Sequence, residues 1–196
     1  MFESVAKFVP LNYYISSLIA GKSLAGDVPC INKVLKTGAV SFDKFDMNQV
    51  KYLPLTYQPD DKHKIHQGDV IISRMNTAEL VGATGYVDIE PKNIFLPDRL
   101  WKADITPNCN PIFLWQMLIS LSVKNNIRKI ATGTSGSMKN ISKKDFLAIP
   151  VLKVPLSLQN QFAAFVQQVD KSRLAVQKSL DELEILKKSL MQEYFG

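Results

Sequence analysis

The sequence contains few cysteines and few histidines, and this scarcity excludes several classes of protein. The two cysteines, Cys30 and Cys109, lie far apart and form no CxxC pair. We therefore expect reduced thiols of a cytosolic protein, and neither a disulfide framework nor a zinc site. The two histidines, His63 and His66, lie in a strongly polar stretch. A surface loop is favoured there over a metal site, because no third ligand is suitably spaced.

Long apolar runs are missing as well. No run reaches the ~18–20 residues that span a bilayer, and Lys7 is the only base near the N-terminus, so neither a membrane helix nor a signal peptide is expected. No Ser-His-Asp or Cys-His arrangement can be assembled. The stretch "SSLIAGKS" (16–23) has serine where a P-loop needs glycine. We expect a cytoplasmic protein that is not an enzyme and needs no cofactor.

Positive charge, by contrast, is concentrated in one window. The chain has a net charge of +6, and residues 122–144 contain six bases and no acid. Glycines and hydroxyl side chains lie between these bases, a composition that suits contact with a phosphate backbone. A solvated loop that is merely basic is an equally good interpretation of this window alone. The bases are Lys124, Arg128, Lys129, Lys139, Lys143 and Lys144.

The first part of the chain, residues 1–155, has the pattern of one mixed α+β domain. Short β-rich runs such as "DVIISR" (69–74) and "LVGATGYVDI" (80–89) alternate with turn-forming stretches. Runs of this length predict strands separated by loops.

Two helices are predicted within this part. Asn110 can cap the first, with Pro111 at its first position and "IFLWQMLISL" following. The second begins at Ser142, where "SKKD" resembles a capping box. It must end before Pro150.

The last part, residues 156–196, is expected to be one long helix. From about residue 158 to residue 195 it contains neither proline nor glycine, and apolar residues recur every seven positions. This repeat is typical of a helix of about 55 Å that pairs along its length with another helix. An amphipathic helix folded back on its own domain is the alternative. The residues expected at the pairing interface are Phe162, Phe165, Val169, Val176, Leu180, Leu183, Leu186 and Leu190.

An ordered series of motifs resembles the specificity (DNA-recognition) subunit of type I restriction–modification systems. "GDVIISRMNTAELVGATGYV" (68–87) resembles a strand-turn-strand of that family, and "NPIFLWQML" (110–118) resembles one of its helices. "ATGTSGSMKNISKKDFLAIPV" (131–151) resembles the end of its target recognition domain, after which "PLSLQ" (155–159) opens the long helix. The resemblance covers the chain from about Val28 onward, and the order of the motifs is its specific feature.

The resemblance implies a module that binds double-stranded DNA and organises a complex. Its target recognition domain would read one half of a bipartite site. Its long helix would pair antiparallel with a second such helix as a coiled coil and dock methyltransferase (modification) subunits. Methylation and cleavage would then reside in partner subunits, and a restriction subunit is a further candidate partner. Family members usually carry two recognition domains and two helical regions, so this chain resembles a half-length form.

A half-length form leaves several arrangements open. Two copies that pair through the helix would form a homodimer with two-fold symmetry, which predicts a palindromic bipartite target. Pairing with a different half-subunit and a degenerate fragment are the other arrangements. An alternative of another class is a coiled-coil adaptor or assembly inhibitor that binds the methyltransferase without reading DNA.

Two segments are expected to contact DNA. In "SRMNT" (73–77), Arg74 and Asn76 suit bidentate contacts with guanine and adenine edges, although Arg74 could instead pair with Glu79 at the surface. In the basic window, Arg128 and Lys129 could instead solvate the end of the preceding helix. The residues expected to contact DNA are Arg74, Asn76, Thr77, Arg128, Lys129, Thr132, Thr134, Ser135, Ser137, Lys139, Lys143 and Lys144.

Overall fold

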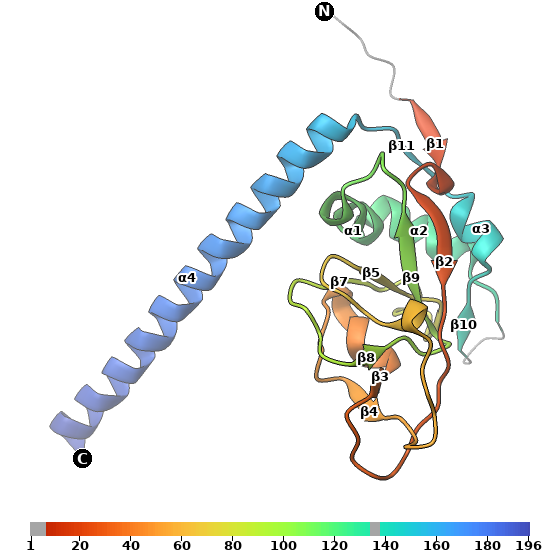
Figure 1. The fold of residues 1–196 in the computed structure, drawn as a ribbon. Helices are drawn as coiled ribbons and strands as arrows, with labels where there is room; N and C mark the ends of the chain where they lie inside the picture. Colours follow the sequence, from red (N-terminus) through yellow and green to blue (C-terminus); the bar gives the residue numbers. More distant parts are fainter. Residues whose placement is uncertain (1–6, 134–137) are drawn as a thin grey trace, which may run out of the picture.

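The computed structural model of the chain describes residues 7–133 and 138–196. Thr134, Ser135 and Ser137, which are expected to contact DNA, lie outside the described residues. Figure 1 shows a globular part, which we call the body (residues 7–155), and a long helix, α4 (Leu156–Phe195), that extends away from it. The mixed α+β class with a long C-terminal helix, expected from the sequence, is confirmed.

An antiparallel sheet runs through the body, and within the described residues its strand order is β2–β9–β5–β7. All four residues of its inner strand β5 are buried, because both faces of the sheet are covered. Val70 and Ile72 pack with Leu114 on one face, whereas Ile71 packs with Leu35 on the other. The strands are β2 (Ile15–Ile19), β5 (Val70–Ser73), β7 (Thr84–Tyr86) and β9 (Leu100–Ile105).

Two helices cover the first face, where the sequence predicted one. Asn110 caps α1 (Pro111–Ile119) as expected, since its Oδ1 accepts hydrogen bonds from the backbone N–H groups of Ile112 at 3.0 Å and Phe113 at 3.2 Å. The apolar run does not continue the helix through Ser120, whose backbone is extended and whose hydroxyl donates to the carbonyl of Met117 at 2.7 Å. A second helix, α2 (Leu121–Ile130), begins directly after this break.

Smaller elements complete the body. In a second sheet β3 pairs in parallel with β8 and antiparallel with β4, and it packs below the other face of the central sheet. Antiparallel pairing of β1 with β11 holds the beginning of the described chain against the segment that leads into α4. The bounds are β1 (Phe8–Pro10), η1 (Leu11–Tyr13), β3 (Lys33–Leu35), η2 (Thr37–Asp43), β4 (Val50–Tyr52), η3 (Asp61–His63), β8 (Ile94–Phe95) and β11 (Pro150–Leu152).

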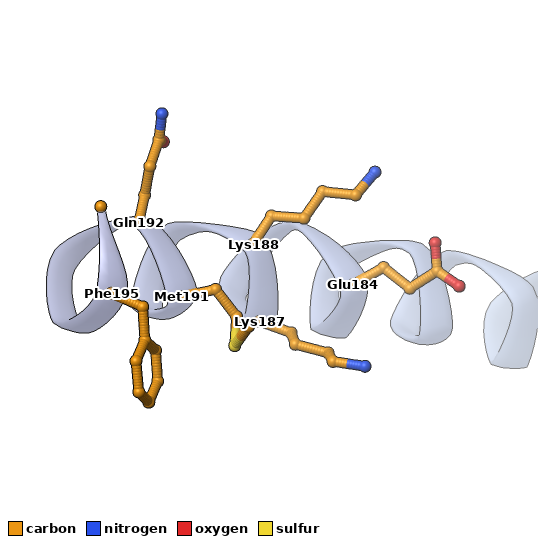
Figure 2. Close-up of a pocket in the computed structure, with 7 residues that line it drawn as sticks. Glu184, Lys187, Lys188, Met191, Gln192 and Phe195 are labelled. Atoms are coloured by element: carbon orange, nitrogen blue, oxygen red, sulfur yellow. The ribbon is translucent and has the colours of Figure 1, made fainter.

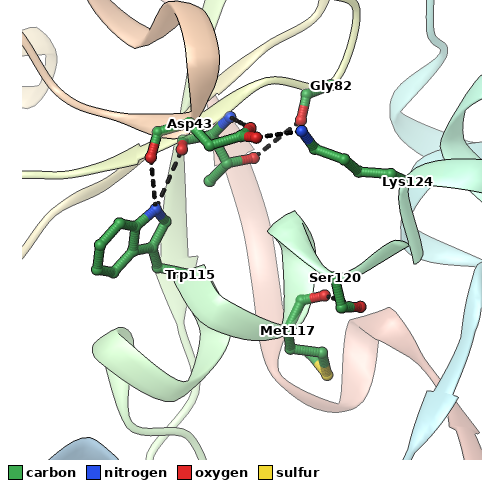
Figure 3. Close-up of polar contacts among 7 residues, drawn as sticks. Asp43, Gly82, Trp115, Met117, Ser120 and Lys124 are labelled. Carbon is green, nitrogen blue, oxygen red and sulfur yellow. Dashed lines mark hydrogen bonds and ion pairs between the residues drawn. The ribbon is translucent and has the colours of Figure 1, made fainter. Parts of the chain in front are cut away.

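Asp43, at the end of η2, ties both helices to the sheet (Figure 3). Its backbone φ is 61°, in the left-handed region that aspartate tolerates better than most residues. The carbonyl oxygen of Asp43 accepts a hydrogen bond from Trp115 Nε1 of α1 at 3.3 Å, and its carboxylate accepts one from the backbone N–H of Thr84 at 3.2 Å. The same carboxylate forms an ion pair with Lys124 of α2, and both side chains are largely buried.

Replacing Asp43 with alanine is therefore expected to lower the free energy of unfolding by about 2–3 kcal/mol. The substitution leaves Lys124 and the N–H of Thr84 without their acceptor. It also places alanine, which adopts a positive φ less readily than aspartate, at this position. The urea midpoint of the full chain measures the effect. Asp43→Asn, which keeps an acceptor oxygen and tolerates this backbone, should lose less. Equal losses for the two variants would contradict the roles given to the acceptor oxygen and to the backbone conformation.

Only the beginning of α4 is attached to the body. Gln159 is fully buried, and its side-chain oxygen accepts a hydrogen bond from the backbone N–H of Asn110 at 2.9 Å. Phe162 meets Phe113 of α1 edge to face at 6.2 Å between ring centroids, and Ala163 is buried beside them. Gln159 and Ala163 are the buried residues of this helix, so α4 does not fold back along the body. None of the helices in the described residues is both long enough and apolar enough to cross a membrane.

Candidate nucleic-acid interface

A two-stranded antiparallel ribbon brings together the two segments that the sequence predicted to contact DNA. Its strands are β6 (Met75–Asn76) and β10 (Lys139–Asn140), in which Asn76 lies opposite Lys139. Thr132 joins this ribbon through two backbone hydrogen bonds with Asn140, of 2.9 and 2.8 Å. The ribbon continues from the buried strand β5 and is followed by the short helix α3 (Lys143–Leu147), so rigid elements hold both of its strands. In Figure 1, β10 and α3 lie on the side of the body away from α4.

Arg74, at the base of the ribbon, is oriented by an aromatic ring. The guanidinium carbon lies 5.7 Å from the centroid of the Trp101 ring, a cation–π arrangement, and Trp101 itself is buried. Among the described residues, no ion pair joins Arg74 to Glu79. The guanidinium is therefore held by the core and not by a neighbouring surface carboxylate.

Unpartnered polar atoms gather at the same place. Within the described residues three buried side-chain nitrogen or oxygen atoms have no hydrogen-bond partner, and they are Arg74 Nε, Trp101 Nε1 and Asn140 Oδ1. Asn140 lies on the strand next to the one that follows Arg74, because the N–H of Ile141 donates to the carbonyl of Arg74 at 3.0 Å. Buried polar groups are normally paired, so these atoms require partners from water or from a bound molecule.

Asn76 and Thr77 form the turn after β6. Asn76 Oδ1 accepts a hydrogen bond from the N–H of Thr77 at 2.9 Å, and its Nδ2 lies 3.3 Å from the hydroxyl oxygen of Ser73. One hydrogen bond at each end of the Asn76 amide therefore stabilises the turn, which leaves one lone pair and one N–H hydrogen for a contact with a base. Thr77 is exposed.

The three lysines around the ribbon differ in their freedom. Lys139 Nζ donates to the carbonyl of Gly133 at 2.7 Å, and Lys143 Nζ donates to the carbonyl of Leu18 in β2 at 2.6 Å. Lys144 is exposed on α3, whose first turn Ser142 caps by accepting from the N–H of Asp145 at 3.1 Å, as expected from the sequence. Lys143 thus also fastens α3 to the central sheet.

Arg128 and Lys129 are exposed in the last turn of α2, where positive charge complements the helix dipole. Lys129 borders a hollow together with Asp145 and Pro150, on the surface shared by α2 and α3. The structure therefore places this pair on the helix that leads to the ribbon and not on the ribbon itself.

Arg99 is a further cation at the ribbon that sequence reasoning missed. Its carbonyl oxygen accepts a hydrogen bond from the N–H of Arg74 at 3.1 Å, and its Nη1 lies 4.0 Å from Met138 Sδ, just before β10. Arg99 reaches this position because β9 pairs with β5 in the register that sets Leu100 opposite Ser73. No local motif in the sequence indicates that Arg99 lies at the ribbon, and only the register of β9 on β5 places it there.

The cysteines and histidines occupy local structural positions. Burial raises the pKa of the Cys109 thiol to about 12, which keeps it protonated and unreactive at neutral pH. His66 Nδ1 lies 2.9 Å from a carboxylate oxygen of Glu90, whose pKa is lowered by a hydrogen bond from the N–H of Gln67 and by His66. Partial burial lowers the pKa of His63.

The second candidate site is the apolar stripe of α4, formed by the eight residues expected at the pairing interface. Their exposed fractions range from 42% at Phe162 to 63% at Phe165, although all eight are apolar. Figure 2 shows the end of the helix, where Met191 and Phe195 project from one side and Lys188 and Gln192 from the other. Nearer the body, Val166 and Leu174 border a cavity of about 530 Å³ whose other wall includes Trp115.

Comparison with known proteins identifies the family. The family model described as "Type I restriction modification DNA specificity domain" matches residues 22–184, far more than half of the chain. The chain belongs to this family. The resemblance read from the ordered motifs is thereby confirmed, and the matched region of this specificity domain contains the ribbon, α1 and most of α4.

Individual relatives of the specificity domain agree with this assignment. The type I restriction enzyme EcoKI specificity subunit of Escherichia coli is 27% identical over 168 residues, which cover 83% of this chain and 36% of the relative. The solved S subunit of the type I restriction–modification system from M. genitalium aligns with 99% of this chain at 17% identity and a TM-score of 0.55. The HsdS subunit from Thermoanaerobacter tengcongensis aligns with 100% of it at 16% identity and a TM-score of 0.58.

At these identities the two solved structures show a shared fold. The chain spans less than half the length of the proteins that it matches: 36% of the Escherichia coli subunit and 46% of each solved subunit.

Proposed function

We propose that this specificity domain is a non-catalytic, sequence-specific DNA-binding subunit of a type I restriction–modification complex, in which it recognises one half of a bipartite target. The single observation that carries the proposal is the pairing of β6 with β10, which unites the two predicted DNA-contacting segments on one rigid ribbon. In this proposal residues 1–155 form the target recognition domain and residues 156–196 form the spacer and dimerisation region.

The shape and chemistry of the ribbon support base reading. The major groove of B-DNA is about 12 Å wide and admits a two-stranded ribbon. Trp101 holds the Arg74 guanidinium at the base of the ribbon, and a fixed guanidinium loses little freedom on forming two parallel hydrogen bonds with one guanine. Lys139 and Lys144 flank it with charge for the phosphates, which fix register on the duplex without reading sequence.

The exposed stripe of α4 supports pairing with a second copy. Eight apolar side chains keep 42–63% of their surface exposed along a helix that is anchored to the body at its beginning, so this apolar stripe is largely open to a partner. If a second α4 ran antiparallel to the first, the stripes of the two copies would cover each other. The pair would also place two recognition domains on one DNA duplex. The helical region of such a homodimer would also dock the methyltransferase subunits.

The experiment that tests the proposed function is methylation mapping across a genome, with the chain produced together with its cognate methyltransferase subunits. We expect methylation at a palindromic target of two short half-sites separated by a fixed spacer, because a two-fold symmetric dimer presents the same ribbon to both half-sites. An asymmetric target would replace the homodimer with a pair of different half-subunits.

Two further outcomes of the mapping would contradict DNA reading by the chain or base reading by Arg74. A stable complex with the methyltransferase that directs no methylation would favour the adaptor or assembly-inhibitor function. Methylation at an unchanged target when the ribbon residue Arg74 is replaced with alanine would show that Arg74 reads no base.

A further inference from the structure

The body also contains a basic cleft, which adjoins the ribbon at Arg99 and whose two lysines are not among the proposed DNA contacts. The cleft has a volume of about 570 Å³ and lies between the edge of the second sheet and the turn before β9. Lys36, Lys51 and Arg99 line it, and all three are exposed. The remaining lining is small or apolar for the most part, and it consists of Ser23, Leu24, Ala25, Val34, Leu35, Thr37, Pro97 and Asp98.

Strand pairing fixes where the cations of the cleft lie. Lys51 lies on β4 opposite Val34 of β3, and Lys36 follows β3 directly, with its N–H donating to the carbonyl of Gln49 at 2.8 Å. The two lysines therefore come from adjacent strands of one sheet. Arg99 lies on the other wall, directly before β9.

Charge in the cleft is predominantly positive. Among the described residues, the ion pairs include neither Lys36, Lys51 nor Arg99. The single carboxylate of the lining, Asp98, is engaged by the hydroxyl of Ser23, which also accepts a hydrogen bond from the N–H of Asp98 at 3.2 Å. The lining therefore holds three cations without an ion pair among the described residues and one carboxylate that is hydrogen-bonded to Ser23. This excess of positive charge suits an anion.

Arg99 joins the cleft to the ribbon. Its carbonyl accepts from the N–H of Arg74, and its guanidinium lies beside Met138, next to the first residue of β10. In Figure 1, β3 and β4 lie at the end of the body away from α1, and β10 lies at its edge. Arg99 is therefore the residue through which a duplex on the ribbon would reach this cleft.

We infer that the cleft lined by Lys36, Lys51 and Arg99 is a second DNA-binding site, which grips the phosphate backbone beside the base pairs that the ribbon reads. The inference rests on the proposed DNA-binding function and adds a site to it. The lysine ammonium groups of the cleft are point charges that do not favour one geometry of hydrogen bonding. The cleft therefore contributes affinity and register on the duplex but no sequence preference. Arg99 spans both sites and aligns one with the other.

The test compares the full-length double variant K36Q/K51Q with the wild-type chain on two short duplexes, one with the mapped target and one with a scrambled sequence. Each lost phosphate contact makes the slope of log affinity against log salt less negative by about 0.9, so two lysines change it by about 1.8 for each bound body. Affinity near 0.1 M salt is then expected to fall roughly 60-fold on both duplexes alike. Fluorescence anisotropy over a range of salt concentrations measures both quantities.

The matched control is K92Q/K178Q, which removes the same charge from exposed positions outside the cleft, in the loop before β8 and on α4. In this control the slope of log affinity against log salt should stay close to that of the wild type, because only the net charge of the chain changes. Acetylation of the bound complex supplies a local readout, in which Lys36 and Lys51 should be protected by the duplex while Lys92 and Lys178 are not.

Each contrary result is distinguishable. A wild-type chain that binds DNA, with an unchanged slope in K36Q/K51Q, overturns the cleft alone. Loss of affinity confined to the target duplex overturns the phosphate assignment in favour of base reading. Protection of the two lysines by inorganic pyrophosphate but not by a duplex would make the cleft a small-phosphate site. A wild-type chain that binds no duplex, even in complex with its cognate methyltransferase subunits, overturns the proposed function, and the cleft with it.

Discussion

The double variant V176E/L183E is expected to sediment as a folded monomer under conditions in which the wild-type chain is a dimer. Val176 and Leu183 both leave 60% of their surface exposed and lie well beyond Ala163, the last buried residue of α4. Two-fold symmetry would bury four unpaired carboxylates in one helix pair. Burying each of them costs several kcal/mol, so the dissociation constant of the dimer should rise by at least roughly a thousandfold.

A monomer produced in this way should keep its body intact. Glutamate is a good helix former, so α4 itself is retained. The anchor at Gln159 and Phe162 is unchanged, so the thermal midpoint of the body should match that of the wild-type monomer at high dilution. Sedimentation velocity reports the oligomeric state, and the thermal midpoint shows that loss of the dimer does not come from unfolding.

The control for charge is Q177E/Q192E, which introduces two glutamates on faces of α4 outside the stripe. This variant should remain a dimer. If V176E/L183E dimerised as tightly as the wild type, the stripe would not be the interface. A truncation offers a second check, provided that it begins after Gln167, because a cut at Asn160 would also remove Phe162 and Ala163 from the packed junction.

The elements that the sequence predicted are those whose signals are local. Asn110 and Ser142 cap α1 and α3 as expected, since a capping side chain bonds to N–H groups two or three residues ahead. The long proline-free repeat gave α4 for the same reason. Strand β5 was visible as a short, continuous run of apolar residues, because both faces of the sheet are buried.

The features that escaped prediction depend on contacts between distant parts of the chain. The bond from Lys143 Nζ to the carbonyl of Leu18 joins positions 125 residues apart, and nothing in "SKKDF" distinguishes this tethered lysine from its free neighbour Lys144. Arg99 reaches the ribbon only through the register of β9 on β5. The break at Ser120 is local, but a serine within an apolar run is compatible with a continuous helix as well as with a cap.

The candidate site was therefore predicted as a set of residue types and not as a geometry. The sequence named Arg74 and the basic window, and strand pairing brought them together at the ribbon. It did not predict that Trp101 would orient Arg74, nor that each end of the Asn76 amide would form one hydrogen bond within the turn. Of the two residues chosen for base reading, the structure leaves Arg74 as the stronger candidate.

Reversing the charge of the three lysines around the ribbon, in K139E/K143E/K144E, is expected to weaken DNA binding by on the order of 10²–10³ at about 0.1 M salt. If each lysine contacts one phosphate, the slope of log affinity against log salt becomes less negative by about 2.7 for each body bound, and the added carboxylates repel the backbone further. Affinity measured over a range of salt concentrations tests both. The control K62E/K92E/K178E carries the same change of charge at exposed positions away from the ribbon.

One of the three lysines also contributes to the fold, and a separate variant isolates that part. Lys143→Met removes the hydrogen bond to the carbonyl of Leu18 together with one positive charge, so its effect on stability can be subtracted from that of the triple variant. Lys144→Glu alone changes an exposed side chain and should reproduce about a third of the change in slope without altering the urea midpoint. An unchanged slope in Lys144→Glu and in the triple variant, with the chain folded, would remove the lysines from the DNA contact and leave Arg74 and the Lys36–Lys51 cleft to account for binding.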